Sequence, residues 1–162
     1  MKQIKVEELT WESFHDFGEF SNMIQPDGVY QGDIPARVYR DRIAGNFDPT
    51  SLVAFLTNEV YPREKDLIEK TENHWNTSEV NMPMDGDVIL AVCPAKRIVN
   101  FNEFRAFRIP KGTMIRLKAG VYHTGPFVTG EEIVHVLVVV PEAMYLKDLH
   151  FYPLDEPIEI VK

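Results

Sequence analysis

Short runs of β-prone residues, each ended by turn-forming residues, recur along the whole sequence and limit the folds that this chain can adopt. The runs are rich in Val, Ile, Phe and Tyr, which favour extended strands. We expect strands over residues 4–9, 37–43, 52–61, 67–74, 79–82, 87–93, 104–109, 113–117, 121–123, 133–140 and 158–161. Pro, Gly, Asn and Asp cluster between the runs, as is typical of turns. Many short strands in one chain of 162 residues predict an all-β sandwich or a small barrel.

One helix is expected near the start of the chain. Thr10 can cap it, residues 11–17 would form it, and Gly18 would end it. Aromatic residues recur here at partly helical spacing, and we expect them to cover the open end of a barrel: Trp11, Phe14, Phe17 and Phe20.

The charge balance and the cysteine content argue against several classes of protein. The chain has 17 Lys and Arg against 25 Asp and Glu, a formal net charge of −8, and no basic block. This pattern argues against a nucleic-acid or membrane-surface partner. The single cysteine, Cys93, excludes an intrachain disulfide. The charged, alternating N-terminus is unlike a signal peptide and the apolar runs are too short to span a bilayer, so we expect a cytoplasmic protein.

Two groups of residues stand at spacings that suggest a shared site. They are Glu72-x-His74-x4-Glu79-x6-Gly86 and Gly112-x7-Gly120-x2-His123. Glu72 and His74 are two residues apart, so on a strand they share one face. Glu79 lies on the next expected strand, after a turn. If the sheet rolls into a barrel, both groups can point into one mouth.

This arrangement resembles the two motifs by which the cupin superfamily is identified, G-x5-H-x-H-x3-4-E-x6-G and G-x5-P-x-G-x2-H-x3-N. The matching spacings run from His74 to Gly86 and from Gly112 to His123. The first histidine, the proline and the asparagine of the motifs are replaced here by Glu72, Lys118 and Phe127. The resemblance implies an all-β, cupin-type double-stranded β-helix, or jelly-roll barrel, with additional N-terminal strands and a short helix.

A longer pattern resembles the ureidoglycolate lyase family of cupins over roughly residues 30–140. Its parts are Glu72-Asn-His74, Glu79-Val-Asn-Met-Pro83-Met84, Val88-Ile-Leu-Ala-Val-Cys-Pro94, Arg105-Ala-Phe107 and Gly120-Val-Tyr-His123. The family's usual glutamine and tryptophan are Glu79 and Tyr122 here. The resemblance implies one domain over residues 1–162, with an N-terminal extension of about residues 1–35 and a barrel of about residues 36–162. It also implies a homodimer.

The resemblance further implies an enzyme that splits ureidoglycolate, or a similar small ureido hydroxy acid, into glyoxylate and urea. The expected catalytic residues are His74, His123 and Glu79. A divalent metal would be held by Glu72, His74, Glu79 and His123, and these ligand types suit Zn, Ni, Mn or Fe. The small carboxylate substrate would be contacted by Arg105, Lys118 and Tyr122, with Arg116 as a further candidate for gripping the carboxylate.

Other interpretations of the same residues stay open. The chain could be a metal-binding cupin of another function: a sugar- or carboxylate-binding module, an isomerase or an oxygenase. Glu72 and Glu79 make the expected site acidic, and two carboxylates repel an anionic substrate unless a metal or an arginine neutralises them. The histidines could also be hydrogen-bonded strand residues without a role in chemistry, and Arg105 could lie on the outer face of its strand.

Overall fold

Strands dominate the computed structural model, which describes residues 1–39, 42–45, 47 and 50–162. The strands of this part are β1 Lys2–Glu8, β2 Gly18–Asn22, β3 Val53–Val60, β4 Leu67–Asn73, β5 Glu79–Pro83, β6 Val88–Cys93, β7 Arg105–Ile109, β8 Thr113–Leu117, β9 Tyr122–His123, β10 Phe127–Val128, β11 Val134–Pro141 and β12 His150–Val161. The helices are short: α1 Trp11–Phe14, the 3-10 helix η1 Phe101–Glu103 and α2 Met144–Lys147. The expected all-β class is confirmed. Among the described residues, no helix is long and apolar enough to cross a membrane.

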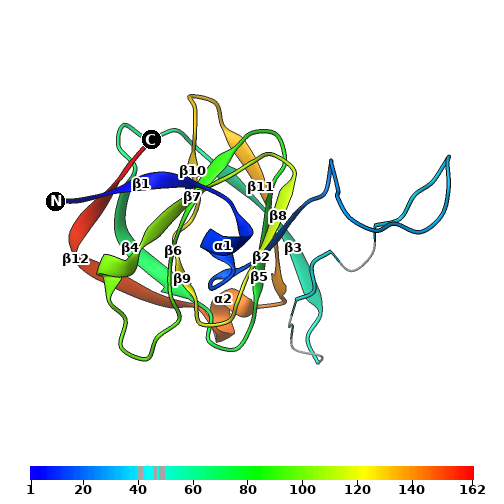
Figure 1. Cartoon of the computed structure of the whole chain (residues 1–162). Helices are drawn as coiled ribbons and strands as arrows, with labels where there is room; N and C mark the ends of the chain where they lie inside the picture. The colour runs from blue at the N-terminus through cyan, green and yellow to red at the C-terminus, as the bar shows by residue number, and fades with distance from the viewer. Residues whose placement is uncertain (40–41, 46, 48–49) are drawn as a thin grey trace.

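The strands form two sheets (Figure 1). The larger has the order β10-β6-β7-β1-β12-β4-β9, and β9 also pairs with β6, so six of its strands close into a barrel. The smaller sheet has the order β2-β8-β5-β11-β3. β1 lies parallel to both β7 and β12, which brings the two chain ends to the same side of the molecule (Figure 1). Of the first two strands, β1 belongs to the larger sheet and β2 to the smaller one.

The wall formed by β6 separates two hydrophobic cores. Val88, Leu90 and Val92 pack into the core between the two sheets. The alternate residues Ile89, Ala91 and Cys93 pack into the closed barrel. Successive strand residues point to opposite faces, so a strand with a core on each side must be apolar throughout. This requirement explains why the run over residues 88–93 has no polar member.

The N-terminal helix is shorter than the sequence predicts. Thr10 caps α1 through Ser13, as expected, but the helix ends at Phe14 and not at residue 17. The next residues turn into β2, which pairs with β8 from Gly18 onward. A Cβ at Gly18 would lie 1.9 Å from the main-chain oxygen of Arg116, so the glycine allows the close approach of the two strands. Gly18 thus starts a strand and does not serve as a helix cap.

Three of the four N-terminal aromatic residues that were expected to cover a barrel end pack inside the molecule. Phe14 and Phe17 are buried in the core between the sheets, and Phe20 packs against it. The ring of Phe14 meets that of Phe107 edge-on at 5.3 Å between centroids. Trp11 is exposed, so its expected place in this cover is wrong. It begins a helix of only four residues, of which the structure buries Phe14 alone.

Two expected strands differ from the structure. The described part of residues 37–43 forms only an isolated bridge between Val38 and Gln31, and residues 40–41 lie outside the described part. This short stretch finds no partner strand in either sheet. By contrast, the strand expected over residues 158–161 begins already at His150. Pro153 and Pro157 suggest a break, but a register shift between Pro153 and Ile158 accommodates them beside β4.

The packing of Phe107 provides a test of the core. Replacing this fully buried ring by alanine leaves a cavity under α1, so Phe107→Ala should lower the free energy of unfolding by about 3–5 kcal/mol. Phe151→Ala is the matched control, because its ring is exposed on β12. Chemical denaturation of both variants measures the difference. Equal losses of stability would contradict the proposed core.

Candidate active site

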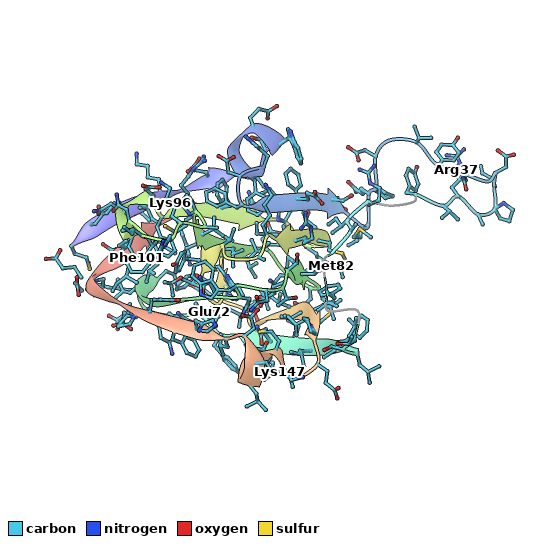
Figure 2. The ribbon with its side chains drawn as sticks, turned by 90° about the horizontal axis from the view of Figure 1, so that it is seen from below. Arg37, Glu72, Met82, Lys96, Phe101 and Lys147 are labelled. Carbon is cyan, nitrogen blue, oxygen red and sulfur yellow. The ribbon has the colours of Figure 1, made fainter. Side chains whose placement is uncertain are left out.

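Four candidate residues converge from both sheets on the core between them. Glu72 on β4 lies directly opposite His123 on β9 in the closed barrel wall. His74 follows the last residue of β4, and Glu79 begins β5 in the other sheet. Figure 2 shows Glu72 within the body of the molecule. The structure therefore brings together the two sequence groups, whose histidines His74 and His123 are 49 positions apart in the sequence.

Strand register explains why these polar groups point inward. His123 pairs with Val92, and Glu79 pairs with Leu117. Side chains of directly paired residues lie on the same face of a sheet. Val92 and Leu117 both belong to the core between the sheets, so His123 and Glu79 face that core as well. Both are buried.

The carboxylate of Glu79 lies between the two imidazoles. Its Oε2 atom is 3.0 Å from Nε2 of His74, and its Oε1 atom is 3.7 Å from Nε2 of His123. The side-chain amide of Asn81 donates to Oε1 of Glu79 at 2.8 Å. On the other side, Oε1 of Glu72 lies 3.6 Å from Nε2 of His123. The histidine ring centroids are 5.2 Å apart, so one small group could contact all four side chains.

Main-chain oxygens fix the orientation of both imidazoles. Nδ1 of His74 lies 2.9 Å from the main-chain oxygen of Asp148, and Nδ1 of His123 lies 3.1 Å from that of Val121. A carbonyl oxygen can only accept, so each Nδ1 carries the proton and donates it. The two Nε2 atoms are thereby aimed at the carboxylates. Histidines that bind metals have this support from behind.

The charges of the cluster determine its protonation states. Burial alone would raise the pKa of Glu79, but the positive charge of His123, together with the contact from His74 at 3.0 Å, outweighs it and holds that pKa well below its usual range. Burial alone would lower the pKa of His123, but Glu79 and Glu72 outweigh it and raise the pKa to about 9. At neutral pH and without a bound cation, Glu79 is therefore ionised and His123 is charged.

Glu72 differs from Glu79 in its environment. Its side chain is 21% exposed, which makes it the most accessible member of the cluster. Burial raises its pKa, and the opposing effect of His123 is smaller. The structure thus gives the two carboxylates different environments: Glu79 is buried between the histidines, and Glu72 lies at the open side.

The donor set fits a divalent metal ion. One ligand atom from each of Glu72, His74 and His123 can be chosen so that all lie within 4.8 Å of one another. Nε2 of His123 is buried and has no hydrogen-bond partner among the described residues. Two imidazole nitrogens and a carboxylate are typical ligands of Zn, Ni, Mn and Fe. Glu79, the fourth expected ligand, lies beside this trio and contacts His74.

Arg105 and Lys118, two residues expected to hold the substrate, have protein partners instead. The Nε atom of Arg105 donates to Glu7 at 2.8 Å, its Nη1 atom donates to the main-chain oxygen of Ser13 at 2.8 Å, and its guanidinium lies over the ring of Phe107. Lys118 donates to the main-chain oxygen of His15 at 2.6 Å. Both cations therefore anchor the N-terminal segment to the sheets.

Tyr122 and Arg116 lie on the faces opposite the histidine cluster. Tyr122 neighbours His123 on β9, so it points into the closed barrel, where its hydroxyl lies 3.4 Å from the main-chain oxygen of Lys96. Arg116 follows Ile115, which faces the core between the sheets, so Arg116 faces outward and pairs with Glu19 at 2.9 Å. The structure brings none of these expected substrate contacts to the cluster.

Tyr145 on α2, which is 46% exposed, lies close enough to the cluster to be influenced by its charges, and the sequence did not reveal this. Burial, together with the charges of Glu79 and Glu72, raises the pKa of Tyr145 to about 12. No motif marks this position, because α2 is a single turn between two long strands. Only the fold brings it to the site.

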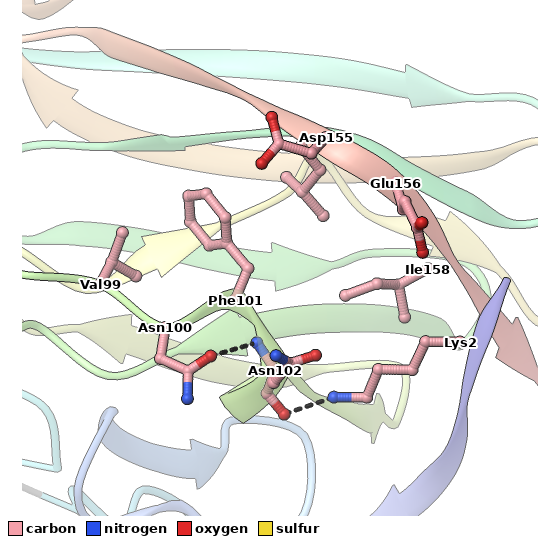
Figure 3. Close-up of a pocket in the computed structure, with 9 residues that line it drawn as sticks. Lys2, Val99, Asn100, Phe101, Asn102, Asp155, Glu156 and Ile158 are labelled. Carbon is pink, nitrogen blue, oxygen red and sulfur yellow. Dashed lines mark hydrogen bonds between the residues drawn. The ribbon is translucent and has the colours of Figure 1, made fainter.

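A separate pocket of about 300 Å³ lies elsewhere in the molecule (Figure 3). Lys2, Asp155 and Glu156 line it, and the amine of Lys2 donates to the main-chain oxygen of Asn102. None of the four clustered residues contributes to its lining. Because Lys2 already has a hydrogen-bond partner, the histidine cluster is the better candidate for an active site.

Comparisons with known proteins identify the family and the fold. The family model described as Ureidoglycolate lyase matches residues 1–161. No curated protein matches the chain. A dTDP sugar isomerase from Desulfovibrio desulfuricans G20 shares the fold, with a TM-score of 0.53 and 14% identity over 85% of each chain. The expected cupin-type barrel is thereby confirmed.

A weaker structural match is a point mutant of the oxalate decarboxylase of Bacillus subtilis. It has a TM-score of 0.46 and 17% identity, and the match covers 65% of this chain. The chain spans only 24% of the length of that protein.

The pKa of His123 tests the charge balance of the cluster. Nuclear magnetic resonance of chelator-treated protein should give a pKa of about 9. In Glu79→Gln the largest raising influence is lost while burial remains, so we expect this pKa to fall by about 1–3 units. The pKa of His123 in the folded protein lies above the ordinary value of 6.5, so protonated His123 stabilises the folded state. This contribution is complete below pH 6.5 and is lost as the pH rises through 9. An unchanged pKa in the variant would contradict the assignment.

Proposed function

Because the chain belongs to the ureidoglycolate lyase family, we propose that it cleaves ureidoglycolate, or a similar small ureido hydroxy acid, to glyoxylate and urea. The observation that carries this proposal is the convergence of two imidazole Nε2 atoms and two carboxylates from both sheets on one point. Such a cluster can hold a cation and move a proton. These are the two capacities that this reaction needs.

The reaction consumes no water and transfers one proton within the substrate. The hydroxyl oxygen loses its proton, and its electron pair forms the carbonyl group of glyoxylate. The bond between the carbinol carbon and the ureido nitrogen breaks at the same time. That nitrogen keeps the bonding pair and takes up a proton to give urea. One carboxylate that accepts the proton from oxygen and passes it to nitrogen completes the balance.

Glu79 is suited to this proton transfer. The histidines keep it ionised at neutral pH, but the same low pKa makes it a weak base, so Glu79 can accept the proton only from a hydroxyl whose own pKa is lowered. Its place is fixed by Asn81 at 2.8 Å and by His74 at 3.0 Å. Tyr145, whose raised pKa reflects burial and the charges of both carboxylates, is a further candidate donor of a hydrogen bond to the substrate.

Glu72, His74 and His123 would hold a divalent ion, as their converging ligand atoms suggest. When bound, such an ion polarises the substrate hydroxyl and lowers its pKa, which makes a carboxylate a sufficient base. It would also offset the negative charge of Glu72 and Glu79, which otherwise repels a carboxylate substrate.

The acidity of the cluster also favours a second candidate function. Two carboxylates with no arginine or lysine paired to them among the described residues suit a neutral ligand such as a sugar better than an anion. A metal-binding cupin that binds or isomerises a sugar would have this character.

Release of glyoxylate from ureidoglycolate distinguishes the two functions. Protein treated with a chelator should regain activity with one of Zn, Ni, Mn or Fe. We expect His123→Ala to lose activity by about 10²–10⁴-fold and to keep its fold. His15→Ala is the control, since His15 lies on the surface beside α1. Normal turnover by His123→Ala, or no glyoxylate with any ion, would reject the lyase.

We further propose that the protein acts in the cytoplasm as a homodimer, without nucleic-acid or membrane partners. The segment after β2 extends away from both sheets, with Arg37 near its tip (Figures 1 and 2). It exposes the apolar side chains Ile24, Val29, Ile34 and Val38. Apolar groups gathered on a projecting segment are typical of an interaction surface, and a second copy can offer the same surface in return.

Sedimentation equilibrium tests the homodimer. The wild-type protein should have twice the chain mass of 18.7 kDa, and the double variant Val29→Asp/Ile34→Asp should have the mass of one chain. Ile98→Asp is the control, because Ile98 is 87% exposed on another loop, close to the 89% of Val29. A monomeric wild type, or a double variant that stays dimeric, would count against pairing through this segment.

A further inference from the structure

Asp148 stands at the junction of α2 and β12 with a buried carboxylate. Its side chain is only 9% exposed. The main-chain N–H groups of Trp75 and Asn76 donate to its two oxygens at 3.0 and 2.8 Å, and the side-chain amide of Asn76 adds a third bond at 3.0 Å. His150 approaches the same carboxylate at 3.6 Å. A buried charge is stable only when it is satisfied in this way, so the geometry of these donors is tightly defined.

The main chain of the same residue contacts the candidate site. The main-chain oxygen of Asp148 accepts a hydrogen bond from Nδ1 of His74 at 2.9 Å. The main-chain N–H of Asp148 donates to the main-chain oxygen of Met144 in α2 at 2.8 Å. Asp148 therefore binds the ring of His74 through its carbonyl and the next two residues of that loop through its carboxylate. Asp148 thus fixes both the His74 ring and the backbone that follows His74.

We propose that Asp148 is a positioning residue, which clamps the connection from α2 to β12 onto the loop after β4 and so aims Nε2 of His74 at Glu72 and Glu79. An imidazole on a loop can rotate about its side-chain bonds unless its second nitrogen is held. The clamp fixes the acceptor of that nitrogen relative to the backbone that carries the ring. The expected effect of Asp148 on metal affinity rests on the proposed function, whereas its expected effect on the orientation of the His74 ring does not.

Asp66 offers a matched control for a merely structural role. Its side chain is also buried, with 5% exposure, and it pairs with Lys162 at 2.8 Å. It precedes the first residue of β4, whereas Glu72 and His74 lie at the far end of that strand. Replacing Asp66 removes a similarly buried carboxylate next to the start of β4 without touching the histidines.

The exchange of the His74 Nδ1 proton with solvent, followed by nuclear magnetic resonance in chelator-treated protein, tests the clamp directly. We expect a protected proton in the wild type and in Asp66→Ala, and rapid exchange in Asp148→Ala. Protection that persists in Asp148→Ala would overturn the proposal. If Asp148→Ala does not fold, Asn76→Ala removes a single bond to the carboxylate and should still speed the exchange. Wild-type exchange in that variant would equally overturn it.

Calorimetric titration with Ni²⁺ or Zn²⁺ gives a second readout. Loss of a supporting contact behind a ligating histidine lowers metal affinity by about 10–100-fold, which we expect for Asp148→Ala and not for Asp66→Ala. Equal affinity in all three proteins would contradict the clamp. The exchange measurement needs neither turnover nor metal, so it tests the role of Asp148 even if the protein has no lyase activity. Absent lyase activity would reject only the proposed function.

Discussion

The pairing of β9 with two neighbours is the constraint on which the other features depend. This strand has only two residues, yet it joins β4 to β6 and so closes the larger sheet into a barrel. Its two side chains point in opposite directions. Tyr122 fills the closed barrel, and His123 enters the core between the sheets. Closure of the barrel and formation of the site are therefore consequences of one pairing.

The second organising principle is the balance of charge around Glu79. Burying a carboxylate among apolar strands is costly, and the structure offsets the cost with Asn81 and two imidazoles. The histidines in turn have their outer nitrogens held by main-chain oxygens. The result is a preorganised group of nitrogen and oxygen donors, with Glu72 alone on the accessible side. Such a group can bind a cation and transfer a proton without rearrangement.

The sequence predicts each half of the cluster well because each half depends on short-range spacing, whereas the meeting of the two halves was expected from the resemblance to cupins. The separation of His74 from Glu79 and of Gly120 from His123 is set by turns between adjacent strands, which a pattern can record. Arg105 was expected to hold the substrate, but its partner Glu7 lies almost a hundred residues away, on a strand whose parallel pairing no local pattern reveals. The same holds for Asp148, whose donors lie more than seventy residues earlier.

Anomalous diffraction from crystals soaked with Ni²⁺ or Zn²⁺ tests the central claim most directly, because it locates a bound ion without reference to turnover. The account predicts one strong peak about 2.0–2.2 Å from Nε2 of His74, Nε2 of His123 and an oxygen of Glu72. An ion bound elsewhere, with none between the two histidines, would contradict the assignment of these residues as a metal centre.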